Sequence, residues 1–102
     1  MHSNFYPQPF DLGVAQIRLA TILGILTKKN DCQSQKNKVI VREEGGIRPL
    51  VQLLRDGNLE AQSHALTALW GVGFNDQNKH VIREEGAIHA VIQVLRTSAF
   101  QN

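Results

Sequence analysis

The sequence predicts an all-α protein built from a repeated set of three helices, and three observations lead to this prediction. A segment near the middle of the chain recurs 41 residues later, apolar residues follow the 3.6-residue period of the α-helix, and glycine-containing turns separate the periodic stretches. The 102 residues suffice for one domain, and a composition of 42% apolar and 20% charged residues is typical of a globular protein.

The internal repeat pairs NKVIVREEGGIRPLVQLLR (37–55) with NKHVIREEGAIHAVIQVLR (78–96), and 10 of the 19 aligned positions are identical. Most of the other positions exchange one aliphatic residue for another. A period of about 40–47 residues is typical of helical solenoids, in which each unit buries its apolar face against its neighbours. We therefore expect stacked helical units.

One complete unit is expected over residues 37–75. Asn37 would cap a short helix that runs to Glu44, and Gly45-Gly46 would end it, since glycine readily adopts the backbone angles of a sharp corner. A second helix would run over 47–55 with Pro49 in its first turn, where a missing backbone donor costs little. After the turn at 56–58, apolar spacing predicts a longer helix over 59–73.

Parts of two further units flank the complete one. Residues 14–28 align with the long helix at an offset of 46 and would be the last helix of a partial unit, with 29–36 as a connector. Residues 77–97 would supply the first two helices of a further unit, preceded by a cap at Asn75-Asp76. Residues 1–13, with Pro7 and Pro9, are expected to be irregular, and residues 98–102 to form a fraying tail.

The unit resembles the armadillo repeat, of the β-catenin-like and plant armadillo type. The matching segments are Asn37–Leu54, Asp56–Gln62, Ala68–Trp70 and Asn75–Asn78, and the resemblance extends over about residues 14–96. It implies a right-handed armadillo-type α-solenoid, with one complete three-helix repeat flanked by two partial repeats. It also implies a non-catalytic protein–protein interaction module, in which stacked third helices line a concave groove that binds an extended peptide or a partner protein.

The resemblance also implies which residues line this groove. They are His64, Thr67, Trp70, Gly71 and Phe74 from the complete unit, and Arg18, Thr21, Ile25 and Lys28 from the first long helix. Trp70, the single tryptophan, would either anchor a partner side chain or pack between adjacent units. Nuclear-import adaptors of this family carry a Trp, and an Asn four residues later, where this chain has Thr67 and Gly71. We therefore do not expect it to recognise basic import signals in the usual way.

Two alternative functions remain open from the sequence. Lys28, Lys29, Lys36 and Lys38 form a basic region that would suit an acidic partner or nucleic acid, although the net charge is only +2 and no aromatic residue is interleaved with the lysines. The chain would also suit a fragment of a larger armadillo scaffold, such as a ubiquitin-ligase substrate-binding array.

The partial units should leave apolar surface open at both ends of the stack. We expect exposure of Ile22 and Leu26 at one end and of Val91 and Val94 at the other. Exposed apolar patches of this kind mark interfaces, so self-association or a neighbouring unit would cover them.

No residues are arranged for catalysis or for a cofactor. The adjacent glutamates at 43–44 and 84–85 point about 100° apart on a helix, and they do not converge on one substrate. The four histidines and Cys32 lack the spacing of metal ligands, and no glycine-rich phosphate loop is present. We expect no enzymatic activity, no cofactor, no metal and no small-molecule substrate.

Location is inferred from what the sequence lacks. It has no secretory signal at its N-terminus and no apolar run of the roughly 18 residues that a membrane span requires. A single cysteine forms no intramolecular disulfide, which suits a reducing compartment. We expect a cytoplasmic or nuclear protein without membrane insertion.

Overall fold

A computed structural model describes the backbone of residues 9–101 and the side chains of residues 15–97. Over these residues the chain forms six α-helices and no strand, which confirms the all-α prediction. The helices are α1 (Pro9–Thr27), α2 (Cys32–Glu43), α3 (Ile47–Asp56), α4 (Leu59–Val72), α5 (Asp76–Glu84) and α6 (Ala87–Gln101).

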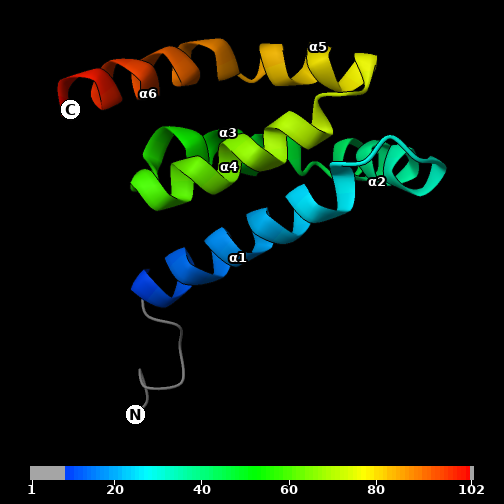
Figure 1. Cartoon of the computed structure of the whole chain (residues 1–102), viewed down its shortest axis with the longest axis horizontal. Helices are drawn as coiled ribbons and strands as arrows, with labels where there is room; N and C mark the ends of the chain where they lie inside the picture. Colours follow the sequence, from blue (N-terminus) through cyan, green and yellow to red (C-terminus); the bar gives the residue numbers. More distant parts are fainter. Residues whose placement is uncertain (1–8, 102) are drawn as a thin grey trace.

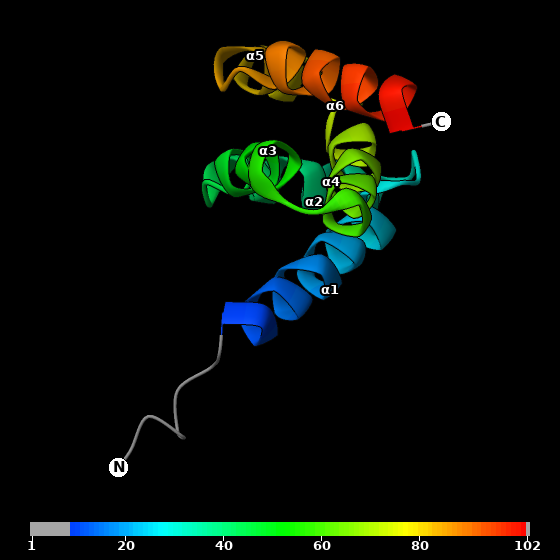
Figure 2. The ribbon, with the colours of Figure 1, turned by 90° about the vertical axis from the view of Figure 1, so that its left-hand side faces the viewer.

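The helices lie in three tiers that follow the order of the chain (Figure 1). Helix α1 forms one outer tier, α2–α4 form the middle tier, and α5 and α6 form the other outer tier. The turned view keeps this order and again places α1 alongside α4 (Figure 2). Helix α4 packs against both α1 and α3, so it occupies the centre of the molecule.

Asparagine and aspartate side chains begin three of the helices. Asn58 accepts a hydrogen bond from the Ala61 N–H at 2.8 Å, and Asn75 accepts one from the Asn78 N–H at 3.0 Å. These caps satisfy backbone donors that have no partner within the helix. The predicted cap at Asn75-Asp76 is confirmed, with Asn75 as the capping residue.

The predicted start of the first short helix at Asn37 was wrong. Helix α2 begins at Cys32, because the carboxylate of Asp31 caps it by accepting from the Ser34 N–H at 2.8 Å. The connector is therefore shorter than the expected 29–36. Asn37 lies within α2, and its side-chain amide donates to the Leu26 carbonyl at 2.8 Å, which ties α2 to the end of α1.

Both terminal predictions also need correction. Helix α1 begins at Pro9, since proline is tolerated in the first helical turn, so residues 9–13 are helical and not irregular. Helix α6 continues to Gln101, so residues 98–101 are helical and not a fraying tail. The remaining residues of these two segments, 1–8 and 102, lie outside the described part of the chain.

The repeated glycine ends the first short helix of each pair in the same way. Gly45 has a φ of 74° and Gly86 a φ of 85°, and no other residue of the described chain has a positive φ. Side chains disfavour this left-handed conformation, so glycine is required at both corners. The predicted breaks between α2 and α3, and between α5 and α6, are confirmed.

The core lies between α3 and α4, with α6 packed on α3 and one side of α1 packed on α4. Leu54, Ala65, Ala68 and Val72 are all 0% exposed. Alanine on α4 allows neighbouring helices to approach closely, because the distance between helix axes depends on the side chains at the contact. The small residues of α4 therefore explain its central place.

Apolar surface is exposed at both outer tiers, as expected. On α1, Ile22 is 49% and Leu26 is 48% exposed. On α6 the expected residues were wrong, because Val91 and Val94 are partly buried against the core. The exposed apolar residues of α6 are Ile88, Ile92 and Leu95.

Candidate protein-interaction surface

The predicted groove residues come from two helices that lie side by side. Arg18, Thr21, Ile25 and Lys28 are on α1, and His64, Thr67, Trp70 and Phe74 are on or directly after α4 (Figures 1 and 2). The two helices approach closely at Gly24, where an added Cβ would lie 3.4 Å from the Thr67 side chain. We refer to these eight residues, grouped as the sequence predicts, as the α1–α4 surface; the described contacts across it are between Thr21 and His64 and between Gly24 and Thr67.

One hydrogen bond crosses this surface. The Thr21 Oγ1 and His64 Nδ1 atoms are 2.8 Å apart. The Thr21 hydroxyl donates its hydrogen to the Ile17 carbonyl at 2.9 Å, so its oxygen accepts from His64. This arrangement requires the His64 ring to carry a proton on Nδ1. The predicted residues Thr21 and His64 are therefore brought together, and both are half-buried.

Gly71 does not lie on the open surface, contrary to the sequence prediction. It is buried where α4 meets the end of α1, and an added Cβ would lie 3.1 Å from the carbonyl carbon of Thr27. Thr27 is itself 0% exposed, and its hydroxyl donates to the Leu23 carbonyl at 2.7 Å. A glycine is needed here because the two backbones almost touch.

Trp70 and Phe74 form an exposed aromatic pair at the end of α4. Trp70 is 71% exposed and Phe74 is 53% exposed. Their ring centroids are 5.4 Å apart at an interplanar angle of 80°, the edge-to-face geometry that aromatic rings favour. The hollow beside the pair lies between α4 and the last two helices, and its lining includes Leu69 of α4, Ile82 and Arg83 of α5, and Ile88 of α6.

The basic region is smaller than the sequence predicted. Lys28, Lys29 and Lys36 are exposed, but Lys38 is only 1% exposed. The Lys38 ammonium donates to the Lys29 carbonyl at 2.8 Å, just beyond the end of α1. Lys38 therefore has a structural role and is not available to an acidic partner or to nucleic acid.

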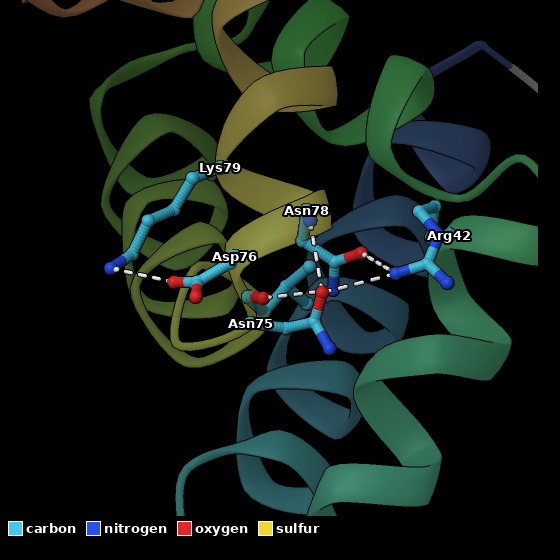
Figure 3. Close-up of polar contacts among 6 residues, drawn as sticks. Arg42, Asn75, Asp76, Asn78 and Lys79 are labelled. Atoms are coloured by element: carbon cyan, nitrogen blue, oxygen red, sulfur yellow. Dashed lines mark hydrogen bonds and ion pairs between the residues drawn. The ribbon is translucent and has the colours of Figure 1, made fainter.

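The main polar network of the molecule was not singled out from the sequence. Asn78 is 0% exposed, and its amide donates to the carbonyls of Lys38 and Val72, each at 2.9 Å. The Arg42 guanidinium donates to the side-chain oxygens of Asn75 at 3.0 Å and Asn78 at 2.9 Å (Figure 3). These bonds join α2, α4 and α5. The recurrence of Asn and Arg in both copies of the repeat was the signal that could have indicated this network.

No group of three or more potential metal-ligating side chains occurs in the part of the chain that the structure describes. Cys32 is exposed and His80 pairs with Glu84 at 3.4 Å within α5. None of the described helices is long and apolar enough to cross a membrane.

Comparison with known proteins agrees with the resemblance over the centre of the chain. Residues 34–71 match the family model of the Armadillo/beta-catenin-like repeat, so this segment is an armadillo repeat. The match covers most of α2, all of α3 and α4 up to Gly71. Repeats of this family generally act as protein-interaction modules and are typically non-catalytic. No curated protein and no solved structure matches the chain.

Proposed function

We propose that this chain is a non-catalytic protein-interaction module that holds an extended segment of a partner along the α1–α4 surface. In this proposal the helices form a right-handed armadillo-type solenoid, with a complete repeat over 37–75 between partial repeats over 14–28 and 77–97. Helices α1 and α4 are then successive third helices, and the surface they share is the concave groove.

The exposed aromatic pair is the observation that carries the proposal. A tryptophan exposed to 71% beside a phenylalanine exposed to 53% is a large apolar surface for a protein to leave in water. Tryptophan is enriched among the residues that dominate binding energy at protein interfaces. Trp70 and Phe74 would therefore bury an apolar side chain of the partner.

Polar and charged groups on α4 and α1 would set the direction of the bound segment. The exposed Thr67 hydroxyl lies one helical turn before Trp70, and its contact within the chain is to the Ser63 carbonyl of its own helix, at 3.1 Å. Arg18 and Lys28 are exposed on α1. An extended partner with an apolar residue over the aromatic pair and an acidic residue over α1 fits this pattern.

Selection of binding peptides from a displayed library of random linear peptides, with the chain as the immobilised target, tests the proposal. Selected peptides should contain an apolar residue close to an acidic one. Phe74→Ala should weaken their binding by about 30-fold, the effect of losing a dominant contact of roughly 2 kcal/mol. Gln52→Ala, on the exposed side of α3, is the matched control and should bind as the wild type does. Selected peptides that bind the Phe74→Ala variant unchanged would refute the assignment of this surface.

A further inference from the structure

An apolar groove lies between α1 and α3. Its lining includes Leu19, Ile22 and Leu23 from α1, and Pro49 and Leu53 from α3. Leu19 is 59% exposed and Ile22 is 49% exposed, so water meets much of this apolar surface.

The α1 wall of the groove is the side that α4 keeps buried. At the 46-residue offset between the two long helices, Leu19 corresponds to Ala65 and Ile22 to Ala68. Ala65 and Ala68 are both 0% exposed, because neighbouring helices cover that side of α4. The same side of α1 therefore lacks a covering helix among the described residues.

The α3 wall of the groove is likewise a packing face. At the 41-residue offset, Pro49 corresponds to Ala90 and Leu53 to Val94. Ala90 is 1% exposed and Val94 packs against the core, in the face of α6 that lies on α3. A helix placed in the groove would therefore pack on this face of α3, just as α3 itself packs on the matching face of α6.

Helix α6 carries the surface that such a helix needs. Its exposed apolar residues match, at the 41-residue offset, three residues of α3 that are almost completely buried. Ile88 (59% exposed) matches Ile47 (1%), Ile92 (42%) matches Val51 (1%), and Leu95 (64%) matches Leu54 (0%). This stripe on α3 is covered by α4 and α6, whereas the stripe on α6 is open among the described residues.

We propose that α6 of one copy of this chain lies in the groove between α1 and α3 of a second copy, so that copies associate head to tail. Helix α1 of the second copy then covers Ile88, Ile92 and Leu95 as α4 covers their counterparts on α3. Among the described residues, α1 has no helix on this side and no helix covers the exposed stripe of α6, and this contact would cover both.

Polar contacts repeated in the sequence support the same register. Gln62 donates from its amide to the Leu54 carbonyl at 3.0 Å, and the matching pair across the proposed contact is Gln16 with the Leu95 carbonyl. A second contact within the chain, between Arg55 and Glu85, also has a counterpart across the proposed contact.

The Arg55 guanidinium donates to the Glu85 carbonyl at 3.4 Å. Its counterparts are Arg96 and Glu44, which are both exposed. Arg96 of one copy would approach Glu44 of the next, where charge of opposite sign favours this orientation.

Two different faces take part in the contact, so it does not form a two-fold dimer. Heterologous contacts of this kind produce open-ended assemblies, or rings where the rotation between copies closes. Trp70 matches Gly24, which is buried against α4, and it would become covered. Phe74 matches Lys28, which is exposed although α4 lies beside it, so Phe74 stays open for a peptide.

Sedimentation equilibrium of the full 102-residue chain tests the proposal. The average mass should rise with concentration beyond twice the monomer mass of 11.4 kDa. Leu19→Glu blocks the groove and Ile92→Glu blocks α6, and each variant alone should remain at 11.4 kDa. An equimolar mixture of the two should reach twice that mass and stop there, because each variant keeps one intact face. Both substitutions are at exposed positions, so the variants should retain the helicity of the wild type.

Three results would overturn the proposal. The first is a wild-type chain that stays monomeric at every concentration, and the second is a single variant that associates by itself. The third is a mixture of Leu19→Glu and Ile92→Glu that stays monomeric, when a mixture of Leu19→Glu with Ile88→Glu, a second variant that blocks α6, also stays monomeric. Phe74→Ala is the matched control. It should associate as the wild type does while its peptide binding weakens, so failure of this contact and failure of the proposed function are separable.

Discussion

The Cα atom of Gly71 lies directly against Thr27 where α4 meets the end of α1. A Cβ at position 71 would be 3.1 Å from the Thr27 carbonyl carbon and closer still to its hydroxyl oxygen. This contact leaves no room for an asparagine side chain at position 71. Helix packing therefore favours glycine at this position.

Gly71→Ala should lower the free energy of unfolding by about 1–3 kcal/mol, because the added methyl group overpacks the contact with Thr27. Gly24→Ala is the matched control. Its Cβ would meet the Thr67 side chain at an ordinary 3.4 Å, and replacing a helical glycine by alanine should stabilise the chain by up to about 1 kcal/mol. Urea unfolding of both variants measures the difference. A Gly71→Ala variant as stable as Gly24→Ala would contradict the close approach of the helices.

Asn78→Ala should lower the free energy of unfolding by about 3 kcal/mol, because it removes two donated bonds and one accepted bond at a side chain with no exposure. Asn37, its counterpart in the repeat, makes an exposed bond to the Leu26 carbonyl, and Asn37→Ala should cost only about 1 kcal/mol. Thermal and urea unfolding test the ranking. Equal losses of unfolding free energy for the two variants would show that the buried hydrogen bonds of Asn78 stabilise the fold no more than the exposed bond of Asn37.

Lys38→Ala should destabilise the chain by about 1–3 kcal/mol, since it removes a buried donor that satisfies the Lys29 carbonyl after α1. Lys79 occupies the matching position in the next unit but is exposed, so Lys79→Ala should change stability by less than about 0.5 kcal/mol. Chemical denaturation of both variants compares them. A larger loss for Lys79→Ala would contradict the placement of Lys38.

Acid should weaken the start of α2. The hydrogen bond from the Ser34 backbone N–H, with smaller effects of the Ser34 side chain and nearby lysines, holds the pKa of Asp31 below its usual value. A carboxylate with a lowered pKa stabilises the fold above its unfolded pKa of about 4, and this contribution is lost as the pH falls through the folded value. The difference in melting temperature between wild type and Asp31→Ala should therefore shrink from pH 5 to pH 2. A difference that does not change over this range would exclude a role for the Asp31 charge.

The elements that could be predicted from the sequence are those with a local cause. The 3.6-residue apolar period gave α3 and α4 nearly to the residue, and the repeated glycine gave both corners with positive φ. The start of α2 was missed because residues 32–36 are polar and show no apolar period. Only the capping bond from Asp31 reveals that these residues are helical.

The candidate site was predicted only in part, because its geometry depends on how two distant helices meet. The armadillo resemblance placed Thr21 and His64 on one surface, and they do form a hydrogen bond. It could not show that Gly71 faces α1 at backbone distance, or that Lys38 is turned inward. Residue type alone suggests solvent for a lysine, and tertiary contacts override that preference.

Binding of a partner segment along the α1–α4 surface is tested most directly by two-dimensional ¹H–¹⁵N NMR. The Ile92→Glu variant, which should remain monomeric and keep Trp70 exposed, would be titrated with a peptide selected on that same variant. We expect chemical-shift changes concentrated at Thr21, His64, Thr67 and Phe74, and at the Trp70 indole. Changes confined to α2 and the exposed side of α3, with these five signals unmoved, would contradict it.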